Sequence, residues 1–323
     1  MPDTAVKFRS AEELAVRDGY GDGVVEAGEK DENVVVLCAD LTQSTRSDKF
    51  KERFPKRFIE IGVAEQNLAG IAAGLALSGK IPFMASYAVF SPGRNWDQIR
   101  VSICYSGANV KIVGAHAGLS VGPDGATHQA LEDVALMRVL PNVAVVVPCD
   151  YEEAKKATIA AAQFDGPVYI RLAREKTSTM TSPDTPFAIG KAQVCLEGRD
   201  ITVIACGPIL HEALVAANTL ALKHGIKCEV LNCASIKPLD EETILTSVRK
   251  TGLAVTVEEH QVAGGLGGAI AELTAQKHPI PVMRIGVEDS FGESGEPKKL
   301  WEKYGLSAAH IVNTIVTLVT SRI

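Results

Sequence analysis

Residues 34–39 read Val-Val-Val-Leu-Cys-Ala, an apolar run with no polar residue to mark a solvent-facing side. Strands of a parallel sheet are buried on both faces and therefore read as unbroken Val-rich and Ile-rich runs. Similar runs follow at 81–86 (IPFMAS), 109–115 (NVKIVGA), 143–148 (VAVVVP) and 168–172 (VYIRL). Helical patterns lie between the runs, at 12–30, after Glu65, near 93–105, at 130–140 and at 150–163. This alternation predicts an α/β layer with a mostly parallel sheet.

A polar segment at 174–190, REKTSTMTSPDTPFAIG, interrupts the pattern, and its clustered Thr, Ser and Pro residues are typical of a linker between domains. A second series follows, with strands expected at 201–207, 227–232, 253–260 and 282–286. Helices are expected at 209–224, after Asp240, at 263–276 and twice near the C-terminus. We therefore predict two doubly wound α/β domains, at 1–175 and 191–323, joined by a linker at 176–190.

Composition argues against several classes of protein. Of the 323 residues, 46% are hydrophobic and 22% charged, which is ordinary for a globular protein and unlike a disordered or fibrous one. The net charge of −6 and the lack of a basic, aromatic-rich stretch make nucleic acid an unexpected partner. The N-terminus, MPDTAVKFRSAEE, has no apolar targeting segment, and no apolar run has membrane-spanning length, so we expect a cytoplasmic protein. Seven scattered cysteines without a CxxC pair are expected to be buried, reduced thiols.

Glu65 is the first candidate for chemistry. It stands in the segment GVAEQNL at 62–68, and the helix that follows, LAGIAAGLALSG, offers almost nothing polar to meet its charge. Burial of a carboxyl group disfavours its ionised form, which suits a group that must hold or share a proton near neutral pH. The alternative is a structural role, in which Glu65 and Glu60 favour the positive end of the helix dipole.

The loop at 115–129, AHAGLSVGPDGATHQ, is the second candidate site. It directly follows an expected strand, and ligands of open α/β sheets collect beyond the carboxyl ends of the strands. Its two imidazoles, His116 and His128, and its carboxylate, Asp124, would suit a polyhydroxylated, anionic substrate. Three alternatives stay open. These are a metal site made of the same three residues, a hydrolase nucleophile at Ser120, which lacks a G-x-S-x-G elbow, and a purely structural loop.

Several motifs resemble those of transketolases, and they occur in the same order over nearly the whole chain. They are GVAEQNLAGIAAGLALSG, YAVF with WDQIR, AHAGLSVGPDGATHQALEDVALMRVLPN, GPVYIRLAR, IKPLD, and VTVEEH with GGLGGAIAE. The resemblance implies a thiamine-diphosphate pyrimidine-binding domain at 1–175 and a transketolase C-terminal domain at 191–323. It implies no separate catalytic motif in the C-terminal domain, which in relatives serves packing and assembly.

By this resemblance Glu65 matches the family's catalytic glutamate, which hydrogen-bonds N1′ of the aminopyrimidine ring of thiamine diphosphate. Tyr87 and Phe90 fall in the aromatic segment that stacks on this ring, although Ser91-Pro92-Gly93 intrudes before Arg94 and leaves open which ring stacks. Asp40 is expected as a further cofactor contact.

The resemblance also implies a set of substrate-binding residues. His116 and His128 are expected to be catalytic together with Glu65, His116 by helping to hold the sugar phosphate and His128 by contacting the oxygens at the reacting carbon. Asp124 is expected to bind a hydroxyl group. The residues expected to bind the phosphate are Arg174, Arg17 and Ser44, with Arg171 as the alternative if the register slips.

The family's metal and diphosphate motif is not recognisable in this chain. Gly21-Asp22-Gly23 resembles its beginning, but it lies in a helical pattern, and the later region STRSDKFKER has no Asn. We therefore expect the diphosphate and Mg²⁺ or Ca²⁺ to be held by a separate N-terminal subunit, with no metal site here. The resemblance implies a split transketolase, built as an α2β2 heterotetramer around a homodimer core, which transfers a two-carbon ketol unit between sugar phosphates.

Three other kinds of protein share parts of this pattern. The corresponding part of a 1-deoxy-D-xylulose-5-phosphate synthase shares most motifs but has Arg where this chain has His116. The β subunit of a 2-oxo-acid dehydrogenase would be expected to lack Asp124 and the paired histidines. A non-catalytic assembly partner of the same fold would have no use for a buried Glu65, which costs stability.

Overall fold

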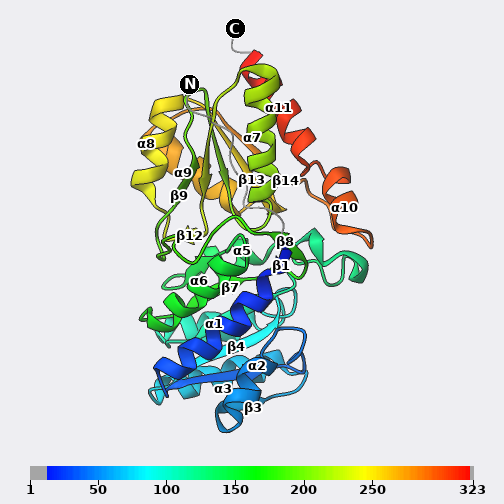
Figure 1. The fold of residues 1–323 in the computed structure, drawn as a ribbon. Helices are drawn as coiled ribbons and strands as arrows, with labels where there is room; N and C mark the ends of the chain where they lie inside the picture. The colour runs from blue at the N-terminus through cyan, green and yellow to red at the C-terminus, as the bar shows by residue number, and fades with distance from the viewer. Residues whose placement is uncertain (1–12, 321–323) are drawn as a thin grey trace.

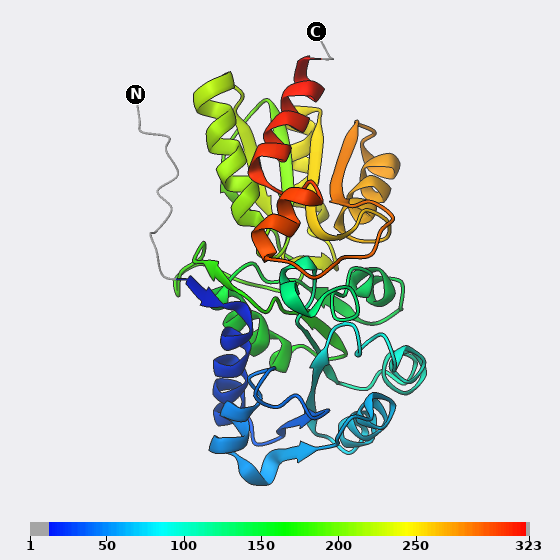
Figure 2. The same cartoon turned by 90° about the vertical axis from the view of Figure 1, so that its right-hand side faces the viewer.

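The computed structural model describes residues 13–320, and the N-terminal segment considered above for targeting therefore lies almost entirely outside the described residues. Two α/β units, each a sheet with its helices and called a layer below, lie one above the other along the long axis of the molecule, with the N-terminal half below and the C-terminal half above (Figure 1). The same two layers are separate in the perpendicular view of Figure 2. The predicted architecture of two α/β domains with mostly parallel sheets is confirmed.

The first layer contains a seven-stranded sheet in the order β12-β6-β7-β5-β4-β2-β3, parallel except for β12. Its strands are β2 (Val34–Cys38), β3 (Phe58–Glu60), β4 (Ile81–Tyr87), β5 (Lys111–Ala115), β6 (Ala144–Val146), β7 (Val168–Arg171) and β12 (Ser235–Lys237). Its helical segments are α1 (Val16–Lys30), α2 (Asp48–Arg53), η1 (Pro55–Arg57), α3 (Glu65–Leu77), α4 (Trp96–Gln98), the π-helix η2 (Ile99–Tyr105), the 3₁₀ segment η3 (Leu119–Asp124), α5 (Asp133–Arg138) and α6 (Tyr151–Gln163).

Successive side chains of each buried strand point to opposite faces of the sheet, and helices cover both faces. Val34 and Val36 face α1 and α6, whereas Val35 and Leu37 face the side covered by α3 and η2. Because each strand is buried on both faces, its sequence is continuously apolar, as expected for a parallel sheet.

The second layer contains a five-stranded sheet in the order β14-β13-β10-β11-β9, in which only the edge strand β9 is antiparallel. Its strands are β9 (Gln193–Leu196), β10 (Ile201–Ala205), β11 (Cys228–Asn232), β13 (Ala254–Gln261) and β14 (Val282–Val287). Its helices are α7 (Leu210–His224), α8 (Glu241–Thr251), α9 (Leu266–Lys277), α10 (Pro297–Lys303) and α11 (Ala308–Thr320). One buried apolar cluster runs through both layers and includes Met137 of α5 and Leu266 of α9.

Three details differ from expectation. The helix expected from residue 12 begins at Val16, and Glu13–Ala15 forms strand β1 instead, paired with β8 (Lys176–Ser178) inside the expected linker. Strand β12 follows the linker in sequence yet completes the first sheet, so the chain crosses back between the layers. Six cysteines are buried as predicted, but Cys195 is exposed because it lies on the edge strand β9.

No helix among residues 13–320 is both long and apolar enough to cross a membrane.

Candidate active site

Tyr87 and His116 are brought together by the parallel pairing of β4 with β5. Tyr87 is the last residue of β4 and lies in register with Ala115, the last residue of β5. His116 follows with a φ of 54°, a left-handed conformation that is uncommon outside glycine. This turn of the backbone stacks its imidazole on the Tyr87 ring, with 3.9 Å between the centroids and 21° between the planes.

Phe90 and His128 complete this cluster of four rings. Phe90 stacks on Tyr87 at 5.9 Å, and His128 meets Phe90 edge-on at 5.4 Å. His128 comes from the loop after β5, where its Nδ1 lies 2.9 Å from the Thr127 hydroxyl. The structure thus brings together both expected aromatic residues and both expected imidazoles, which we call the ring cluster.

Glu65 is the first residue of α3, and its side chain is only 5% exposed. The expectation that almost nothing polar meets its charge is wrong, because Arg94 reaches it from a segment 29 residues further along the chain. Arg94 Nη1 donates to both carboxylate oxygens, at 3.2 and 3.4 Å. The same guanidinium lies over the Phe90 ring, 4.1 Å from its centroid, and so links Glu65 to the ring cluster.

His116 lies beside two of the expected phosphate-binding arginines. Burial, followed by the positive charges of Arg17 and Arg174, lowers the pKa of His116 to about 3, so the ring is neutral at physiological pH. Arg17 Nη1 lies 3.3 Å from His116 Nε2, and since a guanidinium can only donate, Nε2 accepts and the proton resides on Nδ1. Among residues 13–320, this buried Nδ1 has no hydrogen-bond partner.

The remaining expected residues are Asp124, Ser44 and Asp40. Asp124 is exposed, and one of its carboxylate oxygens is 3.7 Å from Arg174 Nη1. Ser44 joins the site through its backbone oxygen, which accepts from Arg17 Nη1 at 2.9 Å. The backbone N–H of Asp40 donates to Glu60 at 2.7 Å. Asp40, Ser44 and Glu60 border a hollow of about 810 Å³.

Arg171, the alternative phosphate-binding residue, is fully engaged in the interior. It donates to Asp133 at 2.8 Å and to the backbone oxygens of Ala130 and Glu259 at 3.1 and 2.9 Å. Arg174, by contrast, is partly exposed and donates one bond, to Val121 O at 2.8 Å, which leaves donors available to an anion. The geometry therefore favours Arg174 over Arg171 as an anion-binding side chain.

Gly21-Asp22-Gly23 lies within α1, as predicted. Asp22 accepts from Lys49 at 2.6 Å and from the Tyr151 hydroxyl at 2.6 Å, so its carboxylate is used in packing α1 against its neighbours. Ser120, the alternative nucleophile, donates its hydrogen bonds to the carboxylate of Glu259 and not to an imidazole. Within the described part of the chain, no group of three His, Cys, Asp or Glu side chains could hold a metal ion.

The arrangement of Arg94 shows what kind of ligand suits Glu65 and Phe90. A guanidinium is planar and carries N–H donors, and here it lies on an aromatic face while donating to a buried carboxylate. A flat nitrogen heterocycle with one protonated ring nitrogen could make the same two contacts. The ring cluster and the arginines then offer a neutral imidazole and an anion-binding pair next to that position.

Comparisons with known proteins match both halves of the chain to family models. The family model described as transketolase, pyrimidine binding domain, matches residues 12–179, and the model described as transketolase, C-terminal domain, matches residues 190–311. The chain is 45% identical over 304 residues to a putative transketolase C-terminal section from Methanocaldococcus jannaschii, covering 93% of this chain and 95% of that protein. It is 44% identical over 301 residues to the 6-deoxy-6-sulfo-D-fructose transketolase subunit SqwH from Clostridium sp. (strain MSTE9), covering 93% of each.

A solved structure described as a split gene transketolase, inactive beta4 tetramer, superposes on this chain with a TM-score of 0.89. Its sequence is 48% identical, and the match covers 95% of this chain and 99% of that one.

Proposed function

Because this chain belongs to the transketolase family, we propose that it is the C-terminal subunit of a split, thiamine-diphosphate-dependent transketolase. In this reaction a two-carbon ketol unit passes from a ketose phosphate to an aldose phosphate. The observation that carries the proposal is the buried carboxylate of Glu65, linked through Arg94 to the face of Phe90 and so to the imidazoles of His116 and His128.

The residues present fit the pyrimidine part of thiamine diphosphate. Glu65 would hold the proton shared with the ring nitrogen, and Phe90, with Tyr87 behind it, would supply the stacking face. Glu65 lies in the first turn of α3, so the helix fixes the position from which its carboxylate meets the ring. When bound, the cofactor would supply the electron sink for breaking and forming the carbon–carbon bond. Asp40 is a further proposed contact at the edge of this site.

The sugar would be bound by residues on the other side of the ring cluster. Arg17 and Arg174 would bind the anionic end, since their guanidinium groups can form paired hydrogen bonds to a phosphate. His116 is held neutral and offers its Nδ1 proton to a hydroxyl or carbonyl oxygen. Asp124 would accept from a hydroxyl, and His128 would exchange protons with the oxygens at the reacting carbon. One relative is named for a sulfo-sugar, so a sulfonate is the alternative anion to test.

A partner subunit is supported by an exposed apolar face on α3 and the neighbouring π-helix. The face consists of Val63 before α3, Leu77 at its end, and Val101 and Tyr105 on the neighbouring π-helix, which are 44–85% exposed. Large exposed apolar side chains on neighbouring elements suit an interaction surface. We propose that an N-terminal subunit covers this face, supplies the diphosphate and Mg²⁺ or Ca²⁺ site, and forms an α2β2 heterotetramer.

A cytoplasmic location in sugar-phosphate metabolism, such as the pentose phosphate pathway, is part of the proposal. Its support is the set of seven free cysteines, because reduced thiols are typical of that compartment. The synthase alternative is less supported, since His116 stands where such enzymes have arginine and the relatives described above are transketolase subunits.

The test combines the purified chain with thiamine diphosphate, Mg²⁺ and a partner subunit that carries the metal motif. We expect no transfer from a ketose phosphate by the chain alone and transfer once the partner is added. Glu65→Ala should abolish activity in the assembled enzyme, whereas Glu29→Gln, which alters a surface ion pair on α1, should not. Turnover by the chain alone would refute the split arrangement, and full activity of Glu65→Ala would refute the role of Glu65.

A further inference from the structure

The loop that carries the proposed substrate residues is hydrogen-bonded to a buried carboxylate of the second domain. We call residues 116–129 the substrate loop. Glu259, near the end of β13 in the second sheet, is 3% exposed and accepts three hydrogen bonds. Two come from the substrate loop, from the backbone N–H of Ser120 at 2.5 Å and from its hydroxyl at 3.1 Å. The third comes from Trp301 Nε1 on α10, at 3.0 Å.

The backbone of the loop is shaped to approach this carboxylate closely. Gly118 has a φ of 87°, which favours glycine, and a Cβ atom placed on it would lie 2.5 Å from the Glu259 Cδ atom. The loop is also held at its far end, where Gln129 Nε2 donates to Leu119 O at 3.1 Å and to Glu293 O of the second domain at 2.9 Å. The second domain therefore contacts the loop on both sides of Asp124.

The bonds to Glu259 are of the strong, charge-assisted kind when the carboxylate is ionised. Burial raises the pKa of Glu259, while the nearby charge of Arg171 and the donors from Trp301 and Ser120 act in the opposite direction. Arg171 also donates to the backbone oxygen of Glu259 at 2.9 Å, so the residue is fixed at both its main chain and its side chain. Such a rigid acceptor can set the position of the loop rather than follow it.

We propose that Glu259 is a positioning residue for substrate binding. By fixing Ser120, it holds the substrate loop in the conformation that presents His116, Asp124 and His128 together to the sugar. The C-terminal domain then contributes to substrate recognition and does more than pack and assemble. This inference rests on the proposed transketolase function only for the identity of the substrate, because the attachment of the loop is a property of the chain itself.

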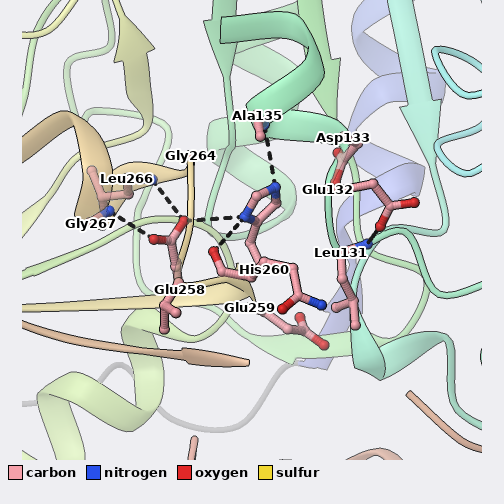
Figure 3. A network of polar contacts seen from close by, with 12 residues as sticks. Leu131, Glu132, Asp133, Ala135, Glu258, Glu259, His260, Gly264, Leu266 and Gly267 are labelled. Atoms are coloured by element: carbon pink, nitrogen blue, oxygen red, sulfur yellow. Dashed lines mark hydrogen bonds and ion pairs between the residues drawn. The ribbon is translucent and has the colours of Figure 1, made fainter. Parts of the chain in front are cut away.

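The neighbouring residue provides a matched control. Glu258 is equally buried, but successive residues of a strand point to opposite faces, and its carboxylate accepts from the N–H groups of Leu266 and Gly267 at the start of α9. Figure 3 shows the carboxylate of Glu258 turned toward α9 and that of Glu259 turned away from it. Glu258→Gln and Glu259→Gln thus remove the same charge from adjacent buried positions, and only the second removes it from the substrate loop.

The first experiment is hydrogen–deuterium exchange of the purified chain, followed by mass spectrometry of peptides that cover residues 116–129. Loss of a charge-assisted hydrogen bond is expected to speed exchange of the loop in Glu259→Gln by roughly ten- to hundredfold. Glu258→Gln should instead speed exchange near the start of α9. Equal exchange of the substrate loop in both variants would overturn the proposal. This measurement needs neither cofactor nor partner, so it stands even if the transketolase assay fails.

The second experiment measures kinetics of the assembled enzyme. Glu259→Gln should raise the KM for the sugar phosphate by roughly tenfold, given the strength of a charge-assisted bond, and leave the Kd of thiamine diphosphate unchanged. Glu258→Gln should lower the melting temperature without this rise in KM. If Glu259→Gln fails to fold, Ser120→Ala removes only the hydroxyl bond and should raise KM by a few-fold. An unchanged KM in both Glu259→Gln and Ser120→Ala would overturn the role in substrate binding.

Discussion

Replacing Arg94 by methionine tests whether the Arg94 side chain occupies the proposed cofactor site when no cofactor is bound. The Arg94 guanidinium donates to both oxygens of Glu65 and lies 4.1 Å from the centroid of Phe90. These are the carboxylate and the ring face that the aminopyrimidine is proposed to use. A ligand that binds there must first displace the guanidinium, so the variant should bind thiamine diphosphate more tightly than the wild-type chain does.

The expected gain in cofactor affinity follows from the solvent exposure of the Arg94–Glu65 ion pair. Arg94 is 52% exposed, and an ion pair with one solvated partner contributes about 0.2–1 kcal/mol. A cation–π contact at an exposed site adds about 0.5–1 kcal/mol. Displacement of the guanidinium therefore costs about 0.7–2 kcal/mol, which corresponds to roughly three- to thirtyfold in Kd. The free chain should lose stability in the same variant, because Glu65 is buried and would lose its partner.

The assay is titration of thiamine diphosphate into the assembled enzyme at saturating Mg²⁺, followed by calorimetry or by the fluorescence of Trp96. Arg53→Met, which removes a cation from an exposed pair on α2, is the matched control and should bind the cofactor as the wild type does. Weaker cofactor binding by Arg94→Met would refute the reasoning, since it would mean that Arg94 holds the cofactor instead of occupying its place.

Two further predictions concern stability and assembly. Burial lowers the pKa of Lys111 to about 7, whereas the unfolded chain keeps this proton to about pH 10.4, so the unfolded state binds more protons between these values. The free energy of unfolding, measured by urea titration, should therefore rise with pH by up to about 1.4 kcal/mol per pH unit above pH 7. This slope should vanish in Lys111→Met. A wild-type free energy of unfolding that does not change with pH in this range would contradict the lowered pKa of Lys111. Leu77→Glu places a charge on the exposed apolar face at the C-terminal end of α3. It should weaken assembly with the partner subunit in analytical ultracentrifugation while the circular dichroism of the chain is unchanged. Unchanged assembly would show that this face is not the interface.

Much of the fold could be predicted because local chemistry decides it. Continuous apolar runs such as 34–38 can be buried only on both faces of a sheet, and the residues just after β4 and β5 must then meet at one edge. That reasoning placed the loop with His116 beyond the carboxyl end of a strand, whereas Tyr87 was indicated by the family resemblance alone. It could not find Arg94, because its contact with Glu65 depends on how the irregular segment 88–95 turns back, and no periodic pattern encodes such a turn. Strand β12 was missed for a similar reason, since pairing across the linker is a property of the whole chain.

The contact between Glu259 and Ser120 is even harder to predict from the sequence. It is separated from Ser120 by 139 residues, and a carboxylate at the end of a buried strand has no local feature that distinguishes a loop contact from a helix cap. Its neighbour Glu258 is such a cap, so two identical adjacent residues act on opposite sides of one strand. The two domains therefore hold different parts of the site in place. Glu65 and Phe90 are held by elements of the first domain, whereas the loop with Asp124 and His128 is held in place by the second, so changes in the second domain should reach the sugar before they reach the cofactor.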